Sequence, residues 1–204
     1  RIFDPGLGRF VEENEASVIS GLMNKDGVVI WHNGTVYRCR FFDPARHQWR
    51  KTDVASGFAT DLTIQDGVVA WSSGTLVNQL VYDLSLQTWK SSQDSAVGTV
   101  SHLQTDGGVV AWNGGRVTYY RVYDPIKGSW QKQEVTNPSA SANLAVADGI
   151  VAWTGGTTTY VRTYDPVLGQ WKGSSVSSGG TPAMQIGQGV VAWNDGVNVY
   201  LRAY

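Results

Sequence analysis

The sequence holds few of the residues on which redox, metal and nucleophilic chemistry depend. Among its 204 residues are one cysteine and three histidines. The single cysteine, Cys39, excludes a disulfide within the chain. It falls in an expected strand, where a buried thiol packs like a small hydrophobic side chain. His32, His47 and His102 fall at different points of the sequence pattern, and no spacing brings His and Cys together as a metal set. We therefore expect no cofactor and no metal.

Charge is also scarce, and the two signs are balanced. Charged residues make up 16% of the chain, and the formal net charge is −1 at pH 7. Duplex nucleic acids are bound by clustered Lys and Arg, which are absent here, so we expect no nucleic-acid partner. No apolar run approaches the roughly 18 residues that a membrane-spanning helix needs, so we expect no membrane insertion. Low charge with much Trp, Ser, Thr and Gly favours a secreted or cell-surface setting, but it does not fix the compartment.

What the chain does contain is a repeat. Short apolar runs, such as GVVAW, each end in a tryptophan, and these tryptophans are spaced 40, 41, 41 and 40 residues apart: Trp31, Trp71, Trp112, Trp153 and Trp193. An aspartate series keeps step with them: Asp4, Asp43, Asp83, Asp124 and Asp165. An aromatic residue follows each aspartate after six positions: Phe10, Trp49, Trp89, Trp130 and Trp171. A fixed period of this length is typical of a repeat architecture.

Each repeat predicts four antiparallel strands. Pairs such as Asp26-Gly27 precede the apolar run, and pairs such as Gly114-Gly115 follow it. These pairs suit the positive φ angles of tight hairpin turns. The aromatic-Asp motif, followed by Pro in four of the five units, opens a third turn before the strand that carries the second aromatic residue. With the aspartates as markers, we expect one domain, 1–204, built from units 4–42, 43–82, 83–123, 124–164 and 165–204.

Four such strands repeated about every 40 residues describe the blades of a β-propeller. Residues 1–3 have the same place in the repeat as residues 202–204. We therefore expect an all-β, five-bladed propeller whose ring is closed when residues 8–13 add the outer strand to the blade formed by residues 180–204. The alternative is an open solenoid, for which we would expect polar end units. Because the chain begins inside a repeat, we also expect it to be part of a longer protein.

The stretches VVAWNGGRVTYYRVYDPIKGSW and GIVAWTGGTTTYVRTYDPVLGQW resemble the kelch repeat. Both join an apolar strand, a glycine pair, an aromatic-Asp-Pro turn and a tryptophan. Only Gly114-Gly115 and Gly155-Gly156 keep the double glycine, and the repeat is shorter than the kelch length of about 50 residues. The resemblance extends over all five units. It implies a propeller fold and a binding role without indicating a substrate.

The first candidate ligand site is the series of tryptophans at the ends of the apolar runs. The rings of Trp31, Trp71, Trp112, Trp153 and Trp193 could bind a sugar together with Asn113, Thr154 and Asn194. An indole offers a sugar its apolar face, and the amide and hydroxyl groups offer hydrogen bonds. The alternative is that a tryptophan at the same place in every blade fills the core between blades.

A second candidate lies ten residues before each of these tryptophans, where Asp61, His102 and Asn143 follow one another in successive units. On innermost strands, these polar side chains would line the channel mouth and bind a small ligand or an ion. The alternative is a water-filled channel with a variable lining. Arg40, Arg121 and Arg162 also recur, and we expect their guanidinium groups to stack on aromatic rings between blades.

The acidic residues give no indication of an enzyme. Two-carboxylate glycoside hydrolysis needs a pair of acids in the cavity, and only Asp61 falls on an expected innermost strand. We therefore predict a non-catalytic binding module. Its partner is a carbohydrate, as for a lectin, or a protein surface. The alternative is a structural scaffold domain of a larger surface protein, and an enzyme with an unrecognised site comes third.

Overall fold

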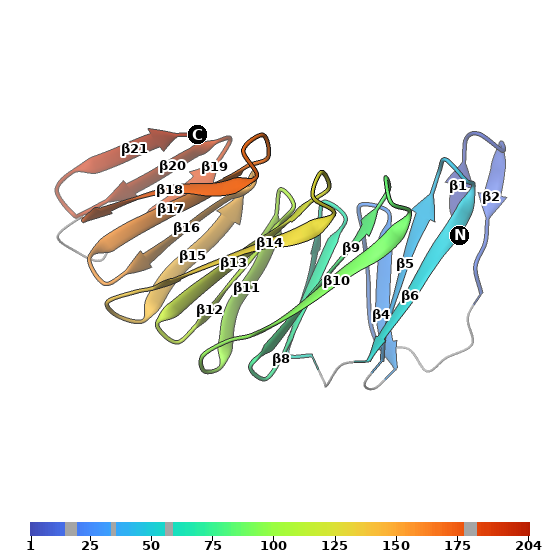
Figure 1. The fold of residues 1–204 in the computed structure, drawn as a ribbon, viewed down its shortest axis with the longest axis horizontal. Coiled ribbons are helices and arrows are strands. Elements are labelled where there is room, and N and C mark those ends of the chain that lie inside the picture. Colours follow the sequence, from blue (N-terminus) through green and yellow to red (C-terminus); the bar gives the residue numbers. More distant parts are fainter. Residues whose placement is uncertain (15–19, 34–35, 56–58, 178–182) are drawn as a thin grey trace.

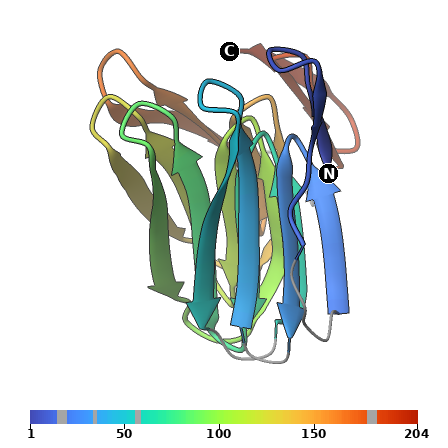
Figure 2. The ribbon, with the colours of Figure 1, turned by 90° about the vertical axis from the view of Figure 1, so that its right-hand side faces the viewer.

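The computed structural model describes residues 1–14, 20–33, 36–55, 59–177 and 183–204. All secondary-structure elements in these ranges are β-strands. The 21 strands form six sheets, of which four have four strands, one has three and one has two. The sheets follow one another in chain order and lie face to face in a row (Figure 1). A view from the N-terminal end shows them one behind another (Figure 2). The predicted all-β fold is confirmed.

The first element is a hairpin of β1 (Ile2–Asp4) and β2 (Arg9–Val11). The first four-stranded sheet contains β3 (Ser20–Lys25), β4 (Val28–Asn33), β5 (Val36–Asp43) and β6 (Gln48–Ala55). The second contains β7 (Asp61–Gln65), β8 (Val68–Ser73), β9 (Leu76–Asp83) and β10 (Thr88–Ser95). The third contains β11 (Val100–Asp106), β12 (Val109–Gly114), β13 (Val117–Asp124) and β14 (Ser129–Thr136). The fourth contains β15 (Ser141–Ala147), β16 (Ile150–Gly155), β17 (Thr158–Asp165) and β18 (Gln170–Ser177), and the last sheet contains β19 (Met184–Gly187), β20 (Val190–Asn194) and β21 (Val199–Ala203).

Each four-stranded sheet is an antiparallel meander in which consecutive strands are neighbours. We call the four positions A, B, C and D in chain order. The register is the same from sheet to sheet: Trp112 on B faces Tyr119 on C, and Tyr123 on C faces Trp130 on D. This is the strand order of a propeller blade, as the repeat predicts.

The A–B turns have the geometry that the sequence predicts. Asp26 and Gly27 both have positive φ angles, of 51° and 77°, and Asp148 and Gly149 have φ angles of 52° and 76°. Two successive positive φ angles define a type I′ turn, whose twist suits a tight hairpin.

The B–C turns differ from the prediction by one residue. Gly114 pairs with Val117 as the end of the ladder, so the loop is Gly115-Arg116, and only Gly115 has a positive φ, of 62°. Glycine at the first loop position is typical of a type II′ turn. The first glycine of the pair therefore belongs to the strand. Asn33-Gly34 lies partly outside the described residues.

The core lies between neighbouring sheets. The B strands of the second, third and fourth full sheets have a sheet against both faces, and β12 is buried along its whole length. A strand that is covered on both faces is apolar throughout, which explains the unbroken GVVAW runs. The layer between the first two sheets joins Val28 and Ile30 to Val69 and Trp71, and the other three layers repeat this pattern.

The expected ring closure is not found in the structure. Within the described residues, β2 pairs with β1 and β21 pairs with β20, and the two ends of the chain lie at opposite ends of the row (Figure 1). β1 pairs with β2 from Ile2–Val11 to Asp4–Arg9 across a four-residue loop, and it occupies the strand edge that β21 would need. A local hairpin costs little loop entropy compared with pairing across the whole chain. The row therefore has four complete blade-like sheets, with an incomplete sheet at each end.

Candidate functional site

The five B-strand tryptophans are core residues. Each is at most 7% exposed: Trp31, Trp71, Trp112, Trp153 and Trp193. The ring of Trp112 stacks on Tyr119 at a centroid distance of 5.2 Å, and the guanidinium of Arg121 lies 5.1 Å from the indole centroid. Arginine therefore stacks on the tryptophan of its own sheet as well as on tyrosine. This burial corrects the expectation of an open sugar platform at Trp71, Trp112 and Trp153, whereas Trp31 also lines a cavity beside the N-terminal residues.

The polar residues beside these rings are used within the fold. Asn113 and Thr154 are each 1% exposed. Thr118 Oγ1 donates to Asn113 Oδ1 at 3.0 Å, and Thr154 Oγ1 donates to the carbonyl of Ala142 at 3.1 Å. The backbone N–H of Gly196 donates to Asn194 Oδ1, which closes a local turn. Asn113 and Thr154 are therefore placed for structure rather than for a ligand at the surface.

Two of the three expected channel-mouth residues, His102 and Asn143, owe their identity to backbone conformation. His102 and Asn143 have φ angles of 55° and 50°, and each lies where the A–B register shifts, between Ser101 and Gln104 or between Ala142 and Ala145. These are β-bulges with one residue in the left-handed region, where Gly, Asn and His are tolerated best. Asp61 begins β7 and accepts a hydrogen bond from Ser72 Oγ at 3.0 Å. The bulges account for His102 and Asn143 without a ligand, whereas Asp61 lies in a regular part of the A–B ladder.

The sequence interpretation missed a row of exposed aliphatic side chains on the C–D turns. We call them the turn ridge, and they are between 42% and 90% exposed: Leu7, Leu84, Leu86, Ile126, Val167 and Leu168. All follow the repeat aspartate by one to three residues, where a solvent-exposed turn is usually polar. This departure from turn composition was the available signal. The turn at residues 44–47 interrupts the ridge with Arg46 and His47.

The turns that carry the ridge are fixed by their aspartates. In the third full sheet, Asp124 is 1% exposed, and its Oδ1 accepts the backbone N–H groups of Ile126 and Lys127. Tyr164 of the following sheet donates to Asp124 Oδ2 at 2.6 Å. The same bond joins Tyr123 to Asp83, and His47 Nδ1 lies 2.6 Å from Asp4 Oδ2.

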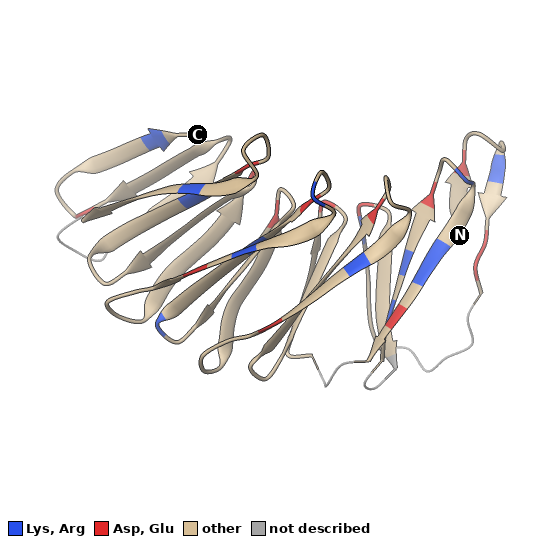
Figure 3. Ribbon diagram, viewed as in Figure 1, with Lys and Arg blue, Asp and Glu red and all other residues tan. Residues whose placement is uncertain are grey.

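The electrostatics of these aspartates follow from the hydrogen bonds. Burial by itself raises the pKa of Asp83, but bonds from Ser85, Tyr123 and the amide of Leu86 outweigh it and lower the pKa to about 2. Burial and the bond to Asp83 both raise the pKa of Tyr123. The carboxylate is thus ionised and the phenol neutral over a wide pH range. Figure 3 shows acidic residues along the turn edge of the row and basic residues across the D strands.

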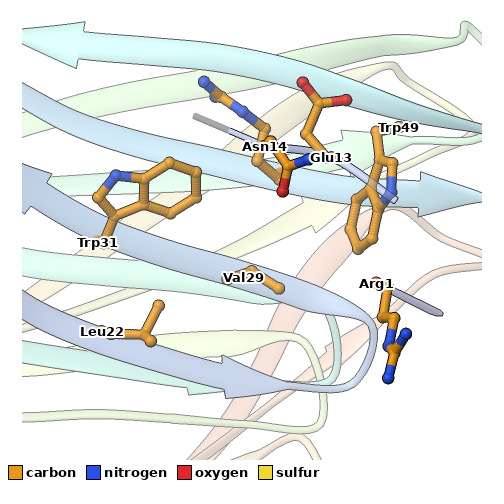
Figure 4. A pocket seen from close by; sticks show the side chains of 8 residues that line it. Arg1, Glu13, Asn14, Leu22, Val29, Trp31 and Trp49 are labelled. Atoms are coloured by element: carbon orange, nitrogen blue, oxygen red, sulfur yellow. The ribbon is translucent and has the colours of Figure 1, made fainter. Parts of the chain in front are cut away.

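A cavity of about 280 Å³ lies between the N-terminal residues and the first full sheet. Figure 4 shows Trp31 and Trp49 on opposite sides of it, with Leu22 and Val29 on the strands below. Its remaining lining residues are Arg1, Glu13, Asn14 and Arg40. Leu22 is 61% exposed, which is unusual for an A-strand leucine in this chain. Aromatic and charged groups meet at this end of the row.

Reactive groups are scarce in the described part of the chain. No group of three or more His, Cys, Asp or Glu side chains among these residues could hold a metal ion. Burial raises the pKa of the Cys39 thiol to about 12, so the thiol is protonated at neutral pH. The described residues contain no helix that is long and apolar enough to cross a membrane.

Comparison with known proteins gives a loose likeness in shape. No family model matches the chain, and no curated protein matches it. Hsv2 from Kluyveromyces lactis is similar over 96% of this chain and 75% of its own, with 11% identity and a TM-score of 0.47. A protein from Lactobacillus plantarum is similar over 87% of this chain and 64% of its own, with 12% identity and a TM-score of 0.42. The computationally designed protein Ika8 is similar over 94% of this chain and 72% of its own, with 17% identity and a TM-score of 0.38. Scores this low bear on neither activity nor ligand, and the fold assignment depends on the strand topology.

Proposed function

We propose that the protein is a non-catalytic interaction module that binds a protein partner through the turn ridge. The observation that carries this proposal is the repetition of exposed aliphatic side chains on successive C–D turns, among them Ile126 and Val167 at 81% and 90% exposure. Single exposed apolar residues are common, whereas their repetition along one edge of the molecule favours a docking surface.

The turns suit this role because they are ordered before any partner arrives. Asp83 and Asp124 each bind the amides of their own turn and the tyrosine of the next sheet. Lys127 Nζ also donates to the carbonyl of Gly169 at 2.6 Å and joins two neighbouring turns. A pre-organised surface loses little conformational entropy on binding. Stacked sheets lie about 10 Å apart, so the partner would present apolar groups at a similar interval.

Selection of peptides from a displayed library tests this proposal. We expect the wild-type protein to recover peptides rich in apolar residues. The double variant Ile126→Lys/Val167→Lys should bind them about tenfold more weakly or worse, which corresponds to a loss of ~1.4 kcal/mol or more. The matched control is Ser91→Lys, which adds a lysine on the exposed face of β10. Selected peptides that bind the ridge variant as well as the wild type would contradict the proposal.

Carbohydrate binding is the second candidate, and the N-terminal cavity favours it. Trp31 and Trp49 with Glu13 and Asn14 would combine aromatic faces with hydrogen-bonding groups, as sugar sites do. A glycan array followed by calorimetry tests it. Trp49→Leu should abolish the binding of any sugar found, whereas Ile126→Lys should leave it unchanged. An array without any bound glycan would exclude this candidate.

The proposal that the protein is not an enzyme is supported by how its reactive groups are used. Asp4, Asp83 and Asp124 are held in turn hydrogen bonds, and the Cys39 thiol is buried.

A further inference from the structure

The C-terminal sheet exposes a face that every earlier full sheet buries. Val190, Val199 and Leu201 are 37%, 73% and 72% exposed. The residues at the Leu201 position of the four preceding sheets are at most 2% exposed: Cys39, Gln79, Tyr120 and Val161. At the Val190 position the exposure is at most 3%: Val28, Val68, Val109 and Ile150. The last sheet therefore carries a core face with nothing packed against it in the described structure.

At the N-terminal end of the row, the first full sheet exposes part of the face that packs against a preceding sheet elsewhere in the chain. Leu22 is 61% exposed, and the cavity of about 280 Å³ opens over Leu22, Val29 and Trp31. At each interface within the chain, this space is filled by the B and C strands of the preceding sheet. The hairpin of β1 and β2 covers the C–D turn end of the first sheet, where Asp4 meets His47. It has no A or B strand with which to fill the rest.

The two ends match each other through the repeat. In the last internal layer, Ile150, Ala152 and Val161 pack against Val191 and Trp193, with Met184 at the margin. In the next repeat, the positions of Ile150, Ala152 and Val161 are occupied by Val190, Ala192 and Leu201. In the first repeat, the positions of Val191, Trp193 and Met184 are occupied by Val29, Trp31 and Leu22. A contact between the two ends would therefore reproduce an interface that the chain already makes four times.

We propose that a second copy of this chain docks head to tail, with its β19–β21 sheet in the cavity over Leu22, Val29 and Trp31. This surface lies at the ends of the row and is independent of the turn ridge. The two faces differ from each other, so the contact is heterologous and each copy keeps one free end.

The register of the β1–β2 hairpin allows a strand exchange at this contact. Arg1–Phe3 have the repeat positions of Arg202–Tyr204, and β1 occupies one edge of β2. An incoming β21 displaces β1 and pairs with β2, which then serves as the fourth strand that the C-terminal sheet lacks. Phe3–Phe10 pairing would become Tyr204–Phe10 pairing between copies. The exchange breaks the three ladder pairs of β1, the contact between Asp4 and His47 and the ion pair between Arg1 and Glu12.

Sedimentation velocity over a wide concentration range tests the contact. We expect the wild type to form dimers and longer species as the concentration rises. Leu22→Lys and Leu201→Lys should each remain monomeric, because each places an ammonium group in the joint. Both leucines are exposed in the single chain, so neither change disturbs its core, and circular dichroism checks the fold. Ser91→Lys is the matched control and should associate like the wild type.

Mixing the two lysine variants gives the sharper result. Each variant keeps one intact end, so the mixture should form dimers that grow no further. Deleting residues 1–3 should strengthen association by freeing the edge of β2.

A wild type that is monomeric at every concentration, or a mixture that forms no dimer, would overturn the proposal. A monomer that both lysine changes make easier to unfold would also overturn it and would indicate closure onto its own end. A wild type that stays monomeric but binds a sugar would overturn the proposal and assign the cavity to carbohydrate instead. Loss of ridge binding by Ile126→Lys/Val167→Lys is measured separately and leaves this contact unchanged.

Discussion

The hydrogen bond between Tyr164 and Asp124 allows the stacking of sheets to be tested with one hydroxyl group. The bond is 2.6 Å long, its acceptor is a carboxylate that is 1% exposed, and it joins two neighbouring sheets. Hydrogen bonds to charged groups contribute about 1.5–3 kcal/mol. Asp124 keeps the amides of Ile126 and Lys127 when the phenol is removed. We therefore expect Tyr164→Phe to lower the free energy of unfolding by ~2 kcal/mol.

The same bond predicts how the loss depends on pH. Burial raises the pKa of Asp124, but the bonds from Tyr164 and from the turn amides outweigh it, so the pKa in the folded protein is lower than usual. A lowered folded pKa means that the ionised carboxylate stabilises the fold above the unfolded pKa of about 4 and ceases to do so as the pH falls through the folded value. The difference between the wild type and Tyr164→Phe should therefore shrink below pH ~4.

Urea unfolding at several pH values measures both effects. The matched control is Tyr160→Phe, because the Tyr160 ring stacks on Trp153 within the same sheet and its hydroxyl has no hydrogen bond to any of the described residues. The control should change stability little at any pH. Equal stability losses in the two variants, or a Tyr164→Phe deficit that persists at low pH, would refute the role of the carboxylate in joining sheets.

Three further predictions concern the core, the turns and the thiol. Trp112→Ala should cost about 3–5 kcal/mol of stability in chemical denaturation, because it removes a fully buried indole; a loss near zero would show that the ring is not core. Acid should unfold the protein as the pH falls from about 4 towards 2, because Asp4, Asp83 and Asp124 all have lowered pKa values and Asp83 has one of about 2; circular dichroism that is unchanged at pH 2 would contradict this. The Cys39 thiol should resist a thiol-specific reagent until the protein unfolds, because it is buried and its pKa is about 12; rapid labelling of the native protein would contradict its burial.

Local features of the fold could be predicted from the sequence because each has a short-range cause. Asp-Gly pairs predicted the A–B turns, since few other residues tolerate two positive φ angles. The GVVAW runs predicted buried B strands. The glycine pair Gly114-Gly115 misled by one residue, because either glycine can take the positive φ and only the pairing with Val117 decides between them.

The candidate site was predicted less well, because it depends on how the sheets stack. His102 and Asn143 resemble ligand-binding residues by type, but the same residue types are favoured in left-handed bulges. The tryptophan series could be read either as a platform or as core, and only the neighbouring sheets decide. Ring closure requires pairing across the whole chain, whereas β1 lies only a four-residue loop from β2. The turn ridge was visible in residues such as Ile126 and Val167, once their turns are known to face solvent.

Small-angle X-ray scattering tests the open row with two uncovered ends most directly. It should be measured on the double variant Leu22→Lys/Leu201→Lys, in which docking between copies is blocked. An open row of stacked sheets predicts an elongated particle whose pair-distance distribution has a long tail (Figure 1). A compact, symmetric distribution, as expected for a flat closed ring, would contradict the open row and the end-to-end contact that depends on it.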